Sequence, residues 1–158
     1  MRRGLLTALY LTTMAGIAWA AWRVHEAGAG TDFLREVYPG LQRSYAHWWD
    51  TKAVAPAGLF TWGFADEGFT KGFRPGMDNL PWGVGQAAAD ATGFVALSAR
   101  YLEKIAGALG DTEGATRYAA DLATIAAAVN AGLWDEGAGF YFDRDTGGRS
   151  FILTKSYS

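Results

Sequence analysis

The stretch AAADATGFVALSARYLEKIAGALGDTEGATRYAADLATIAAAVNAGL, residues 87–133, decides the fold class. Apolar residues recur in it at steps of three and four, which is the period of one helix face. Gly110 interrupts the pattern once, and Asp111 follows it as a helix-starting residue. The stretch therefore predicts helices over about 87–109 and 111–133, and a turn this short makes them antiparallel neighbours. The apolar positions are Phe94, Leu97, Tyr101, Leu102, Ile105, Leu109, Tyr118, Leu122, Ile125, Val129 and Leu133.

A second pair of helices is predicted before this stretch. Ala, Leu, Met and Trp dominate residues 5–27, and Gly28-Ala29-Gly30 ends that helix. Thr31 or Asp32 then serves as the N-cap of the next helix. Pro39 lies inside the second helix and predicts a kink or a break there, because proline lacks an N–H and clashes with the preceding turn. The apolar face of this helix consists of Phe33, Leu34, Val37, Leu41, Tyr45, Trp48 and Trp49.

Two long segments without a helical period alternate with the two short turns. Residues 52–86 contain three prolines and many glycines, and residues 134–148 are rich in Gly and aromatic residues. The second segment is expected to hold a short hairpin at Phe140-Tyr141-Phe142, and a last helix is expected to begin at Ser150. Long loops that alternate with short ones collect at one end of an array of helices. The sequence thus predicts an all-α fold, part of an (α/α)6 toroid, with strand content low throughout.

Composition limits the kinds of function. The 158 residues suit one domain, and 50% hydrophobic with 19% charged residues is a globular composition. A net charge of −2 and a sequence pI of about 5.6 disfavour nucleic acid as a partner. The absence of cysteine rules out disulfides, thiol catalysis and cysteine-bound zinc. Because His25 and His47 are too few for a histidine-built metal site, no metal and no cofactor are predicted.

The N-terminal segment Gly4–Trp22 has no charged residue and follows Arg2-Arg3. Its length permits a membrane span, and Ala18-Trp19-Ala20 resembles the cleavage site of a signal peptide. Threonines and glycines dilute the run, however, and its pattern continues past Trp22. We therefore favour a buried helix, no membrane attachment and a cytoplasmic location, with export through a signal-like helix as the alternative.

The loop stretch Gly72-Phe73-Arg74-Pro75-Gly76-Met77-Asp78-Asn79-Leu80-Pro81-Trp82 is the best candidate for chemistry. A carboxyl held in such a rigid, partly apolar loop could have a raised pKa and act as a general acid, which would make Asp78 catalytic. The alternative is that Asp78 and Asn79 only form a turn, as these residue types commonly do. Trp62 and Trp82 offer flat apolar faces of the kind on which sugar rings stack.

Other polar residues have simpler interpretations. Asp90 is expected to cap the helix that follows the long loop. Asp143 and Asp145, followed by Gly147-Gly148, favour a plain turn over a calcium loop, because the downstream bidentate glutamate of an EF-hand is missing. His25 and His47 are expected to serve in packing, since intermediate burial is normal for histidine.

Three blocks of sequence resemble glycoside hydrolase family 63, which includes mannosylglycerate hydrolases and glucosidase-like proteins and is related to trehalases. The most specific feature is the Gly-Met-Asp-Asn-x-Pro motif at residues 76–81. The first block is Ala21–Ala27, Asp32–Pro39 and Trp48-Trp49; the second is Gly58-Leu59-Phe60, Trp62-Gly63 and Gly76–Pro81; the third is Ala89–Thr92, Leu133-Trp134 and Phe140–Asp143.

The resemblance implies an (α/α)6 barrel that hydrolyses a glycosidic bond with inversion. Asp78 matches the position of the family's general acid, and Trp62, Asn79 and Trp82 are taken as the sugar contacts. The substrate would be an oligosaccharide or small glycoside, such as a glucoside, a mannoside or a related sugar. A second carboxylate would activate water from the opposite face of the sugar ring.

In this family the base is a glutamate far toward the C-terminus, and Glu103, Glu113 and Glu136 do not match its motif. Residues 1–158 are therefore expected to be a single partial barrel segment of about five helices, with 52–86 as the catalytic loop and the C-terminal part of the barrel missing. The isolated chain would then be inactive. The alternative is a non-catalytic truncated fragment, or a helical carbohydrate-binding or scaffold module that lacks the base.

Overall fold

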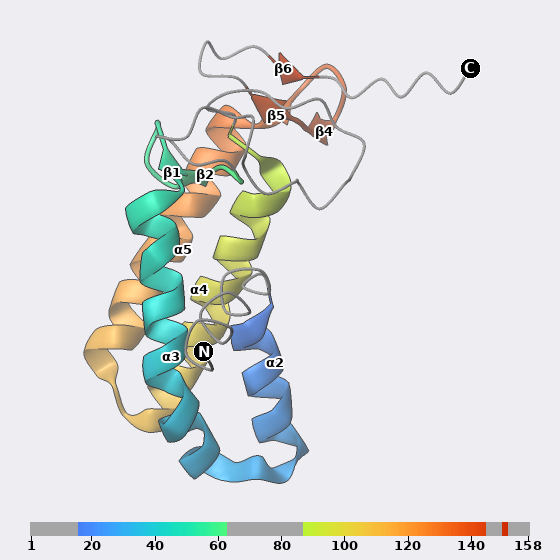
Figure 1. The fold of residues 1–158 in the computed structure, drawn as a ribbon. Coiled ribbons are helices and arrows are strands. Elements are labelled where there is room, and N and C mark those ends of the chain that lie inside the picture. Colours follow the sequence, from blue (N-terminus) through green and yellow to red (C-terminus); the bar gives the residue numbers. More distant parts are fainter. Residues whose placement is uncertain (1–15, 63–86, 145–149, 152–158) are drawn as a thin grey trace, which may run out of the picture. The chain divides into compact units, whose positions relative to one another are not determined.

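The computed structural model describes residues 16–62, 87–144 and 150–151 (Figure 1). The described residues are mainly helical, and each of their six strands is two residues long. The helices are α2 (Ile17–Val24), the π-helical segment η1 (His25–Ala29), α3 (Gly30–Thr51), α4 (Ala89–Leu109) and α5 (Thr112–Gly132). The strands are β1 (Ala53–Val54), β2 (Leu59–Phe60), β3 (Trp134–Asp135), β4 (Phe140–Tyr141), β5 (Asp143–Arg144) and β6 (Ser150–Phe151). The predicted all-α class is confirmed.

The chain forms two compact units. The first comprises residues 1–49 and 94–123, and the second comprises residues 50–93 and 124–158. Helix α2, most of α3 and parts of α4 and α5 belong to the first unit, whereas all six strands belong to the second. The described residues of both long predicted loops are therefore in the second unit.

In the first unit α3 lies along α5. The Tyr38 hydroxyl donates to Asp111 at 2.7 Å, and the Tyr45 hydroxyl donates to Asp121 at 3.1 Å. Tyr45 also meets Tyr118 edge to face, with 5.4 Å between ring centroids. Since contact positions advance together along both helices, α3 and α5 run parallel, as alternate members of an array of antiparallel helices should.

Burial in α3 confirms the predicted apolar face in part. Phe33, Val37 and Trp49 are only half-buried, and the prediction omitted the buried Tyr38. The buried residues of α3 follow one another at steps of three and four, and they are Leu34, Tyr38, Leu41, Tyr45 and Trp48. The predicted break at Pro39 is wrong, because α3 continues through it from Gly30 to Thr51. The alternative, a kink near Tyr38, stays a prediction. Buried residues on both sides of Pro39 share one face, and their packing offsets the cost of the proline, about 3 kcal/mol in a helix interior.

Glycines make the two short turns of the first unit. Gly28, with φ of 110°, and Gly30, with φ of 77°, separate α2 from α3 at the predicted place. Gly110, also with φ of 77°, separates α4 from α5. The Gly114 N–H donates to the Asp111 side chain at 2.9 Å, so Asp111 caps α5 as predicted. That hydrogen bond, together with the one from Tyr38, lowers the pKa of Asp111 below its ordinary value.

In the second unit the β1–β2 hairpin packs on the C-terminal part of α5. A side chain at Gly58, where φ is 95°, would lie 2.9 Å from the carbonyl oxygen of Thr124, so only glycine fits there. Leu59 belongs to a buried cluster with Ala87, Ala128 and Leu133, and Val54, Ala89 and Val129 pack against this cluster.

Two short sheets follow α5. Strands β3 and β4 pair Trp134 with Tyr141, which confirms the predicted hairpin at 140–142. Strands β5 and β6 pair Arg144 with Ser150. The prediction of a helix that begins at Ser150 is therefore wrong for Ser150 and Phe151, because their backbones form the ladder with β5 rather than a helical turn.

Candidate functional site

The candidate site lies around the first turn of α4. Segment 63–86, which contains Asp78, is flanked in the sequence by residues that lie at this turn. The Ala88 N–H donates to the carbonyl of Phe60 at 2.8 Å. Ala87 pairs with Arg144 in an antiparallel bridge, with hydrogen bonds of 2.8 and 3.0 Å. The residues on either side of segment 63–86 are thus hydrogen-bonded into one cluster.

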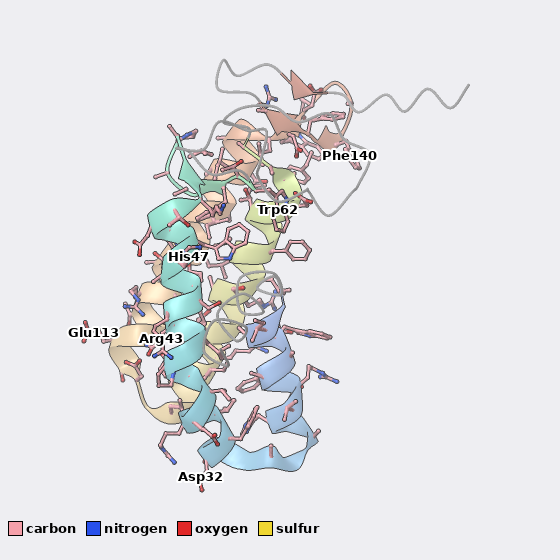
Figure 2. The ribbon with its side chains drawn as sticks, viewed as in Figure 1. Asp32, Arg43, His47, Trp62, Glu113 and Phe140 are labelled. Carbon is pink, nitrogen blue, oxygen red and sulfur yellow. The ribbon has the colours of Figure 1, made fainter. Side chains whose placement is uncertain are left out.

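Trp62 is the last described residue before this segment, and two charged residues hold it. Its indole N–H donates to the Asp90 carboxylate at 2.8 Å. Its backbone carbonyl accepts a hydrogen bond from the Lys52 ammonium at 3.3 Å, and Lys52 itself is only 6% exposed. Trp62 is half-buried (Figure 2).

Asp90 differs from its predicted role as an N-cap. Helix α4 begins at Ala89, so Asp90 lies inside the first turn rather than before it. The oxygen that accepts from Trp62 also accepts from the backbone N–H of Ala91 at 2.7 Å. A carboxylate is favoured at this position by the unpaired N–H groups and by the dipole of the helix.

Asp143 makes a tertiary contact, while Asp145 and Gly147-Gly148 of the predicted turn lie outside the described residues. Asp143 lies in β5, and its carboxylate accepts a hydrogen bond from the backbone N–H of Ala89 at 2.8 Å. Asp143 therefore satisfies the first N–H of α4, the function that the sequence assigned to Asp90. Burial raises the pKa of Asp143 above its ordinary value, the Ala89 hydrogen bond opposes this, and the charge of Asp90 adds to it.

Replacement of Asp143 by Asn should stabilise the chain at pH 7 and leave it little changed near pH 3. Folding raises the pKa of Asp143, so the folded chain prefers the protonated carboxyl. The resulting contribution to stability is fully present below the ordinary pKa of 3.8 and is lost as the pH rises through the raised value. Asparagine keeps an oxygen for the Ala89 N–H without the buried charge. Melting temperatures of the two chains across this pH range test the prediction.

The matched control is Asp32→Asn, because the Asp32 side chain is 94% exposed. We expect its melting temperature to change little, as at most surface positions. A lower melting temperature for Asp143→Asn than for wild type at pH 7 would contradict the prediction.

The buried side chain of Thr92 also belongs to this cluster. The Phe60 backbone N–H donates to the Thr92 hydroxyl at 3.0 Å, and both residues are 0% exposed. The Phe60 carbonyl accepts from Ala88, so both polar backbone groups of Phe60 are bonded to residues in or just before α4. These hydrogen bonds join β2, which precedes segment 63–86 in the sequence, to the start of α4, which follows it.

The predicted site residues differ in how far the structure tests them. Asp78, Asn79 and Trp82 lie outside the described residues, and Trp62 lies in the cluster at the start of α4. Glu113 and Glu136 are exposed, and Glu103 is partly exposed; Figure 2 shows Glu113 pointing away from α5. The indole N–H of Trp134 donates to Glu136.

Histidines and metal ligands are the other polar candidates. The His25 ring lies 5.1 Å from the Trp22 ring, and both His25 and His47 are half-buried. Among the described residues no group of His, Cys, Asp and Glu could hold a metal ion. Within the same residues no helix is long and apolar enough to cross a membrane.

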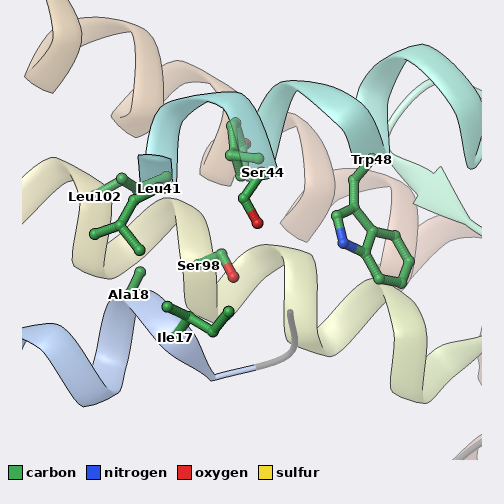
Figure 3. Close-up of a pocket in the computed structure, with 8 residues that line it drawn as sticks. Ile17, Ala18, Leu41, Ser44, Trp48, Ser98 and Leu102 are labelled. Carbon is green, nitrogen blue, oxygen red and sulfur yellow. The ribbon is translucent and has the colours of Figure 1, made fainter. Parts of the chain in front are cut away.

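A pocket in the first unit is too small for a sugar. Helices α2, α3 and α4 line it, and Ser44 and Ser98 bring their hydroxyls to it (Figure 3). Its volume of about 10 Å³ matches a single water molecule. The start of α4 is therefore the better candidate site in the part of the chain that the structure describes.

The fold has counterparts among glycosidase structures. A sialidase matches with 22% identity and a TM-score of 0.58, over 73% of this chain and 10% of its own. The GH78 family rhamnosidase of Bacillus sp. GL1 matches with 22% identity and a TM-score of 0.63, over 84% of this chain and 13% of its own. At this identity the likeness shows the fold alone, and the chain covers only about a tenth of the length of these structures.

The sequence profile of the mannosylglycerate hydrolase MGH1-like glycoside hydrolase domain matches residues 11–158. This chain therefore belongs to the MGH1-like glycoside hydrolase family, which confirms the predicted relationship. No curated protein sequence matches it significantly.

Proposed function

We propose that this chain is a segment of an inverting glycoside hydrolase whose general acid is Asp78. The family supplies the reaction class, hydrolysis of a glycosidic bond. The observation that carries the proposal is the anchoring of segment 63–86 at both ends, beside the half-buried Trp62 and the first turn of α4. In the sequence, Asp78 lies between these two flanks.

We propose Trp62, Asn79 and Trp82 as contacts to the sugar, which would be a glucoside, a mannoside or a related oligosaccharide. Trp62 supports this assignment, because its indole is fixed while part of the side chain stays accessible. Asn79 and Trp82 follow Asp78 in the same segment and are carried by the family motif. A location in the cytoplasm, with residues 1–20 retained, completes the proposal.

We place the catalytic base in a later part of a longer (α/α)6 barrel, of which residues 1–158 are one segment; we refer to the longer protein as the complete barrel. The exposed positions of Glu113 and Glu136 support this placement, as does the small share of the structural neighbours that the chain spans. An inverting mechanism needs the two carboxyl groups roughly 6.5–9.5 Å apart, so that water fits between base and sugar.

The stereochemistry of hydrolysis tests the mechanism. We expect the complete barrel to hydrolyse a glucoside or mannoside and to release first the anomer opposite to that of the substrate, seen by proton NMR before mutarotation. The isolated chain should show no turnover. Release of the retained anomer would overturn the inverting mechanism, and a complete barrel that binds sugar without hydrolysis would favour the carbohydrate-binding alternative.

A further inference from the structure

Trp62 is fixed more firmly than ordinary packing requires. The buried Lys52 ammonium donates a hydrogen bond to the Trp62 carbonyl, and the Asp90 carboxylate accepts one from the Trp62 indole N–H. Lys52, at 6% exposure, belongs to a residue type that is almost never fully buried without a partner. Its ammonium holds the Trp62 backbone, whereas Asp90 holds the far end of the side chain.

The bond to Asp90 fixes the direction of the ring. A tryptophan indole has a single N–H donor, so a carboxylate at 2.8 Å determines how the ring turns about its side-chain bonds. Hydrogen bonds to an ionised acceptor are about twice as strong as neutral ones. Asp90 is itself held by the Ala91 N–H and lies in the first turn of α4, so the acceptor cannot swing away easily.

We infer that Asp90 is a positioning residue, which holds the Trp62 indole as a preformed wall of the sugar site. This inference rests on the proposed function. When a sugar stacks on a ring that is already fixed, binding does not include the entropy cost of immobilising that ring. Ordering one side chain on binding weakens affinity by about twofold to tenfold, and this range is the expected contribution of Asp90.

Three substitutions in the complete barrel test the role. Asp90→Ala should raise KM for 4-nitrophenyl glucoside or mannoside about twofold to tenfold with little change in kcat, because it removes binding that substrate and transition state share. Asp90→Asn keeps an oxygen acceptor and should restore KM largely. In a Trp62→Phe background, which has no indole N–H, Asp90→Ala should change KM no further.

The matched control is Asp111→Ala. Asp111 also lies at the start of a helix, accepts a backbone N–H and binds an aromatic side chain, that of Tyr38. It belongs to the first unit and has no part in the proposed site. Loss of Asp111 should lower stability and leave KM unchanged. An equal rise in KM in both alanine variants would reduce the role of Asp90 to helix capping and overturn the inference.

A measurement without substrate separates this inference from the proposed function. In nitrogen-15 spectra of the 158-residue chain, the Trp62 indole N–H is the signal missing from Trp62→Phe. It should exchange slowly with solvent in wild type and faster in Asp90→Ala. Wild-type hydrolysis with an unchanged KM in Asp90→Ala would overturn the positioning role alone. A wild-type barrel that hydrolyses neither glycoside would overturn the proposed function and, with it, the substrate role of Asp90, whatever the indole signal shows.

Discussion

Replacement of Asp78 by Asn in the complete barrel should lower kcat for an alkyl glycoside by about 10²- to 10⁴-fold, the usual contribution of a general acid. Asparagine has nearly the same size as aspartic acid but has no acidic proton to give to the leaving oxygen. Binding should change little, so KM should stay close to the wild-type value. Steady-state kinetics on purified variants give both quantities.

The leaving group distinguishes loss of the acid from general damage to the site. A glycosyl fluoride departs with far less help from a proton than an alkyl alcohol does. Asp78→Asn should therefore retain much more of its activity on the fluoride than on the alkyl glycoside. Equal losses on both substrates would point to a damaged site, and full turnover of the alkyl glycoside would exclude Asp78 as the acid.

Asp66→Asn is the matched control for this experiment. Asp66 belongs to the same segment of the chain as Asp78 and has no assigned role. The same change of side chain at this position should leave kcat and KM at wild-type values. A loss comparable to that of Asp78→Asn would show that the assay responds to any change in the segment.

The second large effect is expected from Phe60→Ala, which should lower the free energy of unfolding by about 3–5 kcal/mol. Phe60 is 0% exposed in β2, and truncation removes most of its side chain and leaves a buried cavity. Globular domains have a total stability of only about 5–15 kcal/mol, so the variant would be close to unfolding. Urea unfolding followed by circular dichroism measures the loss.

Two variants control this result. Phe60→Leu keeps most of the volume and should cost less than about 1.5 kcal/mol. Phe140→Ala is the same substitution at a side chain that is 64% exposed, and it should change stability by less than about 0.5 kcal/mol. If Phe60→Ala cost no more than Phe140→Ala, strand β2 would not be the buried support that we describe.

The helices could be predicted from the sequence because their signals are local. Leu34, Leu41 and Tyr45 are separated by seven and four residues, about two turns and one turn, so they share one face of α3. Gly28 and Gly110 mark turns by their own backbone preferences. The continuation of α3 through Pro39 could not be predicted, for the complementary reason. The local cost of the proline is real, but the packing that offsets it lies elsewhere in the chain.

The support of the candidate site was much less predictable. Trp62 could be selected from the sequence as a flat apolar face, but its partner Asp90 is 28 positions away. Asp143 is 54 positions from the Ala89 N–H that it accepts, and nothing near it in sequence indicates that contact. Such pairs depend on tertiary structure, and local periodicity carries no information about them.

The contacts of the residues that flank segment 63–86 also bear on how members of this family can differ in the length of this segment. Ala88 is hydrogen-bonded to Phe60 and Ala87 to Arg144, so the residues that flank segment 63–86 are held by contacts outside that segment. Doubling the length of a flexible connection between fixed points costs only about 0.6 kcal/mol. Replacement of this segment by a longer one is therefore expected to cost the rest of the chain little stability.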